Sequence, residues 1–200
     1  MTEQRENQKV TNKTGEDARR PAFVQSLAIA ASFVLLITGA WIIFSQPVSP
    51  KKLYARNFTF HPDLLSREVE DRLSETGFGA NWKLLEELKA GMSAYNSGEL
   101  QQAREHFNAF QTAVPQDGLS PFAGFYEAIV LLKLEQTNEA ISKLQGLTQK
   151  SGFPLKEDAK WYLALAQIKQ NNPETARLIL KELRDVEKYS IKADKLFSNL

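Results

Sequence analysis

The 200-residue sequence contains no cysteine and only two histidines. Without cysteine the chain can form no disulfide and offers no thiolate as a nucleophile or metal ligand. His61 follows a proline-containing stretch and His106 lies far along the chain, so the histidines do not have the spacing of a metal site. No GxSxG nucleophile motif is present. We therefore expect no enzymatic activity, no catalytic residue, no metal and no cofactor.

An excess of charge of one sign is also missing. The whole chain has a formal net charge of +1, and residues 51–200 contain twenty Lys and Arg against twenty Asp and Glu, which leaves zero. Domains that bind nucleic acid carry clustered positive charge, so we expect no nucleic-acid partner. Paired acidic residues such as Glu157 and Asp158 stand beside other charged residues, and we expect them on a solvated helix face.

One long stretch lacks charge altogether. Residues 23–44, FVQSLAIAASFVLLITGAWIIF, contain no Asp, Glu, Lys or Arg. A helix of about 20 apolar residues spans the roughly 30 Å hydrocarbon core of a bilayer. Arg19 and Arg20 precede the stretch, and Trp41 and Lys51 lie near its other end, as is typical of interfacial anchoring. We expect a single transmembrane helix that contacts lipid.

A buried core helix and a cleaved signal peptide are the alternatives for this stretch. The apolar part of a signal peptide has about 7–15 residues and ends in small residues at a cleavage site. Here Thr38-Gly39-Ala40 is followed at once by Trp41 and further apolar residues, which favours a retained anchor. The slight excess of positive charge before the stretch predicts a cytoplasmic tail. We thus expect a single-pass protein of the inner (plasma) membrane with an extracytoplasmic or periplasmic domain.

The segments on either side of the anchor differ in character. Residues 1–22 have no periodic apolar positions and predict a disordered tail. Residues 45–80 predict a linker, because three prolines interrupt its first part, and residues 63–76 have the spacing of a short amphipathic helix. Four linker residues alternate with the two-residue period of a strand: Tyr54, Arg56, Phe58 and Phe60. They predict either an extended segment along the following domain or a spacer with incidental aromatics.

From residue 81 onward one pattern recurs three times. It centres on Ala103, Ala140 and Ala176, which are 37 and 36 residues apart. Bulky apolar residues follow each alanine at four and seven positions, and an apolar set with i, i+3, i+4, i+7 spacing precedes it. Residues that end or cap helices separate the two sets. Each unit therefore predicts a helical hairpin, and residues 190–200 predict a capping helix.

This pattern resembles the tetratricopeptide repeat, a helical hairpin of about 34 residues with an alanine early in its second helix. The resemblance covers residues 82–184 and is clearest in AGMSAYNSGELQQAREHFNAF and WYLALAQIKQNNPETARLILKEL. It implies an all-α protein, in which the transmembrane helix precedes an α-solenoid of about three hairpins at 81–200 with a C-terminal capping helix. Single-anchor proteins with a small exported repeat domain are similar to bacterial envelope factors, some of which accompany secretion or assembly machinery.

The resemblance also implies where a partner binds. In such repeats the first helices of the hairpins form a concave groove, and residues beside their apolar stripe contact a peptide ligand. Transferred by position, these residues are Lys89, Tyr126 and Tyr162 in one row and Asn96, Lys133 and Lys169 in another. Lysine and asparagine can bind a carboxylate or a peptide backbone, and tyrosine supplies contact area. The alternative is that the tyrosines pack between repeats while the lysines lie in solvent.

Together these features predict a function without catalysis. We expect a membrane-anchored scaffold or adaptor that binds a protein or peptide partner at the membrane surface, in secretion or envelope assembly. The alternative is a signalling or regulatory component whose N-terminal tail engages a cytoplasmic regulator.

Overall fold

The computed structural model describes residues 48–76 and 82–200 together with Thr38 and Trp41. The chain divides into two compact units, Met1–Pro47 and Val48–Leu200. The predicted tail at 1–22 lies outside the described residues. So does the predicted membrane span at 23–44, except for Thr38 and Trp41, which are helical and exposed. None of the described helices is both long and apolar enough to cross a bilayer.

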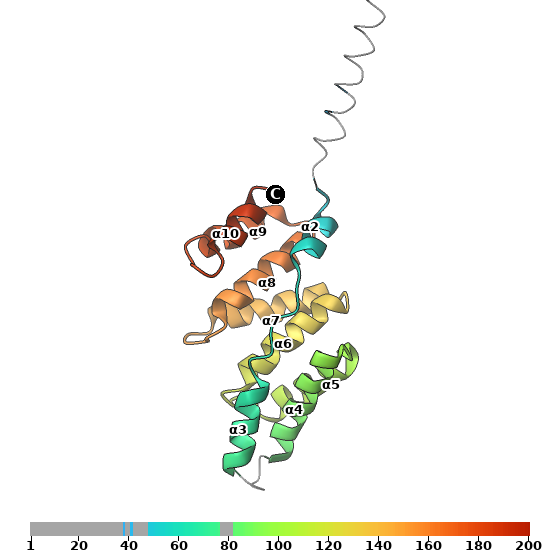
Figure 1. Ribbon diagram of the computed structural model, residues 1–200, viewed down its shortest axis with the longest axis vertical. Coiled ribbons are helices and arrows are strands. Elements are labelled where there is room, and N and C mark those ends of the chain that lie inside the picture. The colour runs from blue at the N-terminus through green and yellow to red at the C-terminus, as the bar shows by residue number, and fades with distance from the viewer. Residues whose placement is uncertain (1–37, 39–40, 42–47, 77–81) are drawn as a thin grey trace, which may run out of the picture. The chain divides into compact units, whose positions relative to one another are not determined.

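All regular secondary structure in the described part of the unit Val48–Leu200 is α-helical, which confirms the all-α part of the predicted fold (Figure 1). Its helices are α2 (Pro50–Asn57), α3 (Ser66–Thr76), α4 (Trp82–Ser97), α5 (Leu100–Ala113), α6 (Ser120–Lys133), α7 (Thr137–Gln149), α8 (Lys156–Lys169), α9 (Pro173–Leu183) and α10 (Ser190–Phe197). From α3 to α10 each helix packs against the next along the chain, and α2 packs against α8. Three hairpins result: α4–α5, α6–α7 and α8–α9.

The hairpins are held together by the small and large side chains that the repeat pattern identified. Ala103, Ala140 and Ala176 are completely buried, as are the bulky residues four positions after each. Gly91 of α4 shows how close the two helices of the first hairpin lie, because a Cβ atom there would stand 2.9 Å from the ring of Phe107. The predicted register of the hairpins is confirmed.

The turn inside each hairpin contains one residue in the left-handed region. These residues are Gly98 with φ 78°, Glu135 with φ 63° and Asn171 with φ 62°, which repeat at the same intervals as the alanines. In each turn the amide of the next residue donates to a carbonyl five positions earlier: Glu99 to Ala94, Gln136 to Leu131 and Asn172 to Gln167. This hydrogen bond is a standard helix ending, and it satisfies a carbonyl that the helix leaves free.

Two glycine substitutions should have opposite effects on stability. A Cβ atom at Gly98 or at Gly146 would meet nothing within 4 Å, so only the backbone conformation distinguishes the two sites. Gly98→Ala places alanine in a left-handed conformation and should cost about 1 kcal/mol. Gly146→Ala lies inside α7 and should stabilise by roughly 0.5–1 kcal/mol. Urea unfolding of both variants measures the change in the free energy of unfolding. Equal changes would contradict the claim that the turn requires a left-handed conformation at Gly98.

One part of the linker prediction is wrong. The strand-like alternation does not describe Tyr54 and Arg56, because both lie in helix α2. Pro50 occupies a first-turn position of this helix, where its fixed φ is favourable and no amide is needed. Leu53 and Tyr54 are buried, and the alternation of four residues could not reveal this helical face.

The other two helices outside the hairpins start and end much as the sequence indicates. Asp63 accepts hydrogen bonds from the amides of Leu65 and Ser66 at 3.0 and 2.9 Å, so α3 begins only at Ser66. At the other end, α10 packs on α9 and buries Ala193 and Leu196. Its Lys and Asp side chains are exposed, as expected for a capping helix.

Candidate functional site

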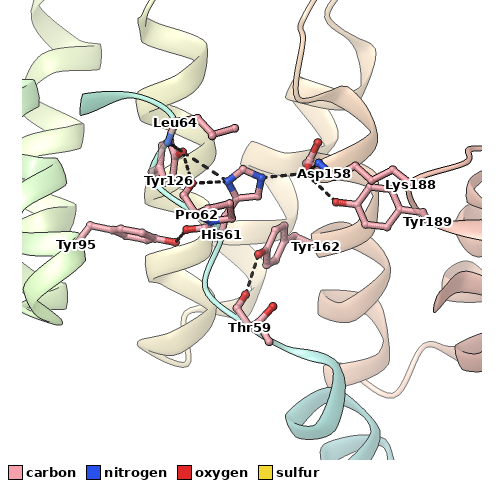
Figure 2. A network of polar contacts seen from close by, with 10 residues as sticks. All are labelled: Thr59, His61, Pro62, Leu64, Tyr95, Tyr126, Asp158, Tyr162, Lys188 and Tyr189. Carbon is pink, nitrogen blue, oxygen red and sulfur yellow. Dashed lines mark hydrogen bonds and ion pairs between the residues drawn. The ribbon is translucent and has the colours of Figure 1, made fainter. Parts of the chain in front are cut away.

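Residues 58–64, which we call the strap, run without regular secondary structure from α2 to α3 (Figure 1). They cross the side of α4, α6 and α8 that carries Tyr95, Asn96, Tyr126, Lys133, Tyr162 and Lys169, which we call the first-helix face. Figure 2 shows three tyrosine hydroxyls donating to strap carbonyls: Tyr162 to Thr59 at 2.8 Å, Tyr95 to His61 at 2.9 Å and Tyr126 to Pro62 at 2.8 Å. The amide of Leu64 donates to the Tyr126 hydroxyl at 2.9 Å. Helices from all three hairpins therefore bind the main chain of one extended segment.

Aromatic rings hold the side chains of the strap. The Phe58 ring lies edge-on to Tyr162 with centroids 5.9 Å apart, and Phe60 lies edge-on to Tyr95 at 5.3 Å. The imidazole of His61 is buried, 5.0 Å from the ring of Phe125. Such tilted arrangements bring the positive edge of one ring to the negative face of another, so each contact adds to the energy of burial.

Two lysines of the first-helix face lie near aromatic rings of α2 and the strap. The ammonium of Lys133 lies 5.3 Å from the centroid of the Phe58 ring and 5.6 Å from that of Phe60, within range for cation–π attraction. The ammonium of Lys169 lies 4.6 Å from the Tyr54 ring and also pairs with Glu135 at 2.9 Å. Both lysines therefore contact aromatic residues of α2 and the strap in the same protein.

Of the six residues predicted for the peptide groove, five contact α2 or the strap and one does not. Five of them contact residues 54–64, and the amide of Asn96 adds a bond of 2.7 Å to the Asp63 carboxylate. The exception is Lys89, whose ammonium pairs with Glu70 of α3 at 3.4 Å. Binding of a separate partner by these residues stays a prediction. Tyr95 was missed, because its position in the repeat pattern counts as part of the apolar face.

Asp158 at the start of α8 is the centre of a buried polar cluster. Its Oδ1 accepts hydrogen bonds from His61 Nε2 at 2.9 Å, from the Tyr189 hydroxyl at 2.7 Å and from Lys188 Nζ at 2.5 Å (Figure 2). Burial works to raise the pKa of Asp158, but the bonds from His61, Lys188 and Tyr189 outweigh it and hold that pKa well below its usual value. The carboxylate joins the strap, α8 and the segment between α9 and α10. The expectation that Asp158 lies on a solvated face is therefore wrong.

His61 faces an acceptor with each of its ring nitrogens. Nε2 lies 2.9 Å from Asp158, and Nδ1 lies 2.9 Å from the carbonyl of Pro62. A neutral imidazole has one N–H, so it can donate to only one of these oxygens. The imidazole therefore lies between the Asp158 carboxylate and the main chain of the strap.

Glu127 of α6 is a second buried acid, at a position where the repeat pattern is often apolar. Its side chain is 1% exposed and accepts from Lys143 of α7 at 2.9 Å and from Gln111 of α5 at 2.5 Å. It therefore joins the first and second hairpins. Every buried side-chain polar atom in the described part of the chain has a partner, and those residues hold no cluster of potential metal ligands.

The comparisons with known proteins agree with the hairpin architecture. The family model of the tetratricopeptide repeat matches residues 87–117 and 158–186, which fall in the first and third hairpins. No match was found among curated proteins or among solved structures. Tetratricopeptide repeats are usually scaffolds without catalytic activity. Residues 87–117 and 158–186 are therefore similar to the tetratricopeptide repeat, a family whose members generally mediate interactions between proteins.

Proposed function

We propose that this protein is a membrane-anchored scaffold or adaptor that holds a protein or peptide partner at the membrane surface. The observation that carries the proposal is the way the first-helix face binds the strap. Hydroxyl groups of Tyr95, Tyr126 and Tyr162 donate to main-chain carbonyls, which every extended peptide presents. A surface with this chemistry is suited to protein recognition, and nothing in it supplies a nucleophile or a general acid aimed at an open site.

The membrane part of the proposal depends on the sequence. Residues 23–44 are uncharged and long enough to cross a bilayer, and they end a few residues before the unit Val48–Leu200 begins. The charge distribution favours an inner-membrane protein with its repeats on the extracytoplasmic side. A partner in secretion or envelope assembly fits this location. Neither nucleic acid nor a cofactor belongs to the proposed function.

Site-specific photocrosslinking in native membranes tests the proposal. A photoreactive residue at position 133 is expected to give an adduct with a partner protein, because Lys133 is exposed at the edge of the first-helix face. The matched control is position 109, since Ala109 is an exposed residue of a second helix. The absence of an adduct at 133, or equal adducts at both positions, would contradict the scaffold.

Two simpler measurements address the anchor and the alternative function. Extraction of the intact chain is expected to require detergent, and release by an alkaline wash would contradict a transmembrane anchor. Deleting residues 2–18 should leave the adduct at position 133 unchanged. A signalling component that works through its tail would instead lose its cellular output.

A further inference from the structure

The strap is bound in the way that a separate peptide would be. It is extended, its carbonyls at residues 59, 61 and 62 accept from tyrosines, and its aromatic side chains contact Tyr95 and Tyr162. Among the described residues, no hydrogen bond between main-chain groups joins residues 59–64 to the helices. The first-helix face would therefore form the same bonds with an extended segment of another chain.

The contacts of the strap differ from those that hold the hairpins together. Ala103, Ala140 and Ala176 and the bulky residues four positions after each have no exposed surface. Phe60, in contrast, is 41% exposed, and Lys133 beside it is also exposed. The interfaces within the hairpins do not include the strap, so the strap can leave the face without opening them.

We propose that the strap is an internal ligand of the first-helix face, and that the partner replaces it with an extended peptide of the same chemistry. That peptide carries two aromatic side chains separated by one residue, then a histidine or another hydrogen-bond donor, and then proline and an acidic residue. This inference rests on the proposed scaffold function and names the class of segment that the partner presents.

Each feature of the peptide follows from one group of the site. Tyr95, Tyr162 and the ammonium of Lys133 favour the two aromatic rings. The buried carboxylate of Asp158 accepts from His61 in the strap, so it suits a peptide with a hydrogen-bond donor at that position. The amide of Asn96, which binds Asp63 in the strap, suits the acidic residue.

The strap must weaken binding of such a peptide to the intact protein. A segment on a short connection acts at an effective concentration in the millimolar range. The apparent affinity for a separate peptide is then the intrinsic affinity of the free face multiplied by the fraction of molecules whose face is free. Substitutions that weaken the strap should raise this apparent affinity, although they remove contacts from the protein.

Fluorescence anisotropy with the full chain in detergent micelles tests this expectation. The probe is a labelled peptide of the strap sequence, RNFTFHPDLL, and its control has serine in place of both phenylalanines and the histidine. The variant carries Phe58→Ser, Phe60→Ser and His61→Ser. It should bind the probe at least about tenfold more tightly than the unaltered chain and should not bind the control peptide. Its helicity should be unchanged, because these residues are not helical.

Removing two donors from the face should reverse the gain. Tyr126→Phe and Tyr162→Phe, added to the strap variant, keep the rings but remove the hydroxyls that bind Pro62 and Thr59. The probe should then bind about tenfold more weakly. If the triple variant loses helicity, Phe60→Ser alone replaces it and should still bind the probe more tightly than the unaltered chain. A folded strap variant that shows no saturable binding would overturn the inference.

Competition separates this inference from the proposed function. An excess of the peptide should abolish the partner adduct at position 133. If the adduct forms but persists at saturating peptide, the scaffold stands and the internal-ligand inference fails. If the peptide binds the strap variant but no partner adduct forms in membranes, the proposed function fails and the inference about the face stands.

Discussion

Raising the pH above about 10 is expected to unfold the repeat domain in one cooperative step. The chain has five tyrosines, and burial raises the pKa of every one of them above the ordinary value: Tyr54, Tyr95, Tyr126, Tyr162 and Tyr189. A phenol with a raised pKa in the folded state contributes stability that is fully present below its unfolded pKa of about 10. That contribution is lost as the pH rises toward the folded pKa, because the unfolded chain then releases protons that the folded chain retains.

The expected size of this effect is large. Each tyrosine lowers the free energy of unfolding by about 1.4 kcal/mol per pH unit between its unfolded and folded pKa values. Five such groups together remove roughly 7 kcal/mol per unit, which is comparable with the whole stability of a domain. Tyrosinate absorbance and helicity should therefore change together as the pH is raised.

A single substitution checks the origin of the alkaline transition. The hydroxyl of Tyr54 makes only a long bond of 3.4 Å to the carbonyl of Leu132, so Tyr54→Phe should change stability little at neutral pH. It should reduce the steepness of the alkaline loss by about 1.4 kcal/mol per unit. Tyrosinate absorbance that rises well before helicity falls would contradict the prediction, because the tyrosines would then ionise in the folded state.

Ala140→Asp should prevent the domain from folding. Ala140 has no exposed surface where α7 packs in the second hairpin, and a carboxylate there would be buried without a partner. The expected loss in free energy of unfolding exceeds about 4 kcal/mol, so the variant should lose helicity or accumulate as insoluble chain. Circular dichroism and urea unfolding of the soluble fraction measure this loss.

The same substitution at an exposed alanine is the control. Ala109 lies on the outward side of α5, so Ala109→Asp should cost less than about 1 kcal/mol, the difference in helix propensity. If Ala140→Asp were as stable as Ala109→Asp, the alanine would not lie between helices, and the register assigned to all three hairpins would be wrong.

The hairpins could be predicted because their signal is local. About 36 residues of sequence contain the patterns of both helices, the turn between them and the small residue that lets the helices approach. The pattern recurs around Ala103, Ala140 and Ala176. The helix at α2 was missed for the opposite reason. Its one buried side consists of Leu53 and Tyr54, too few positions to show a helical period.

The polar cluster could not be predicted, because its members are far apart in the sequence. Asp158 meets His61 across 97 residues, and it meets Lys188 and Tyr189 across 30 and 31. Beside Glu157 the acid looks like part of a solvated face. Only the path of the strap brings a histidine to it, and no local pattern determines that path.

The direction of the strap has a consequence for synthesis on the ribosome. The N-terminal part of the strap meets the third hairpin, since Thr59 accepts from Tyr162, which is 103 residues later. At about 5–20 residues per second, Thr59 emerges roughly 5–20 s before its partner exists. The first hairpin can close in that interval and His61 can meet Tyr95, whereas the Thr59 end of the strap must wait for the third hairpin. Complete docking of the strap is therefore among the last steps of folding, and until then part of the first-helix face on the nascent chain stays uncovered.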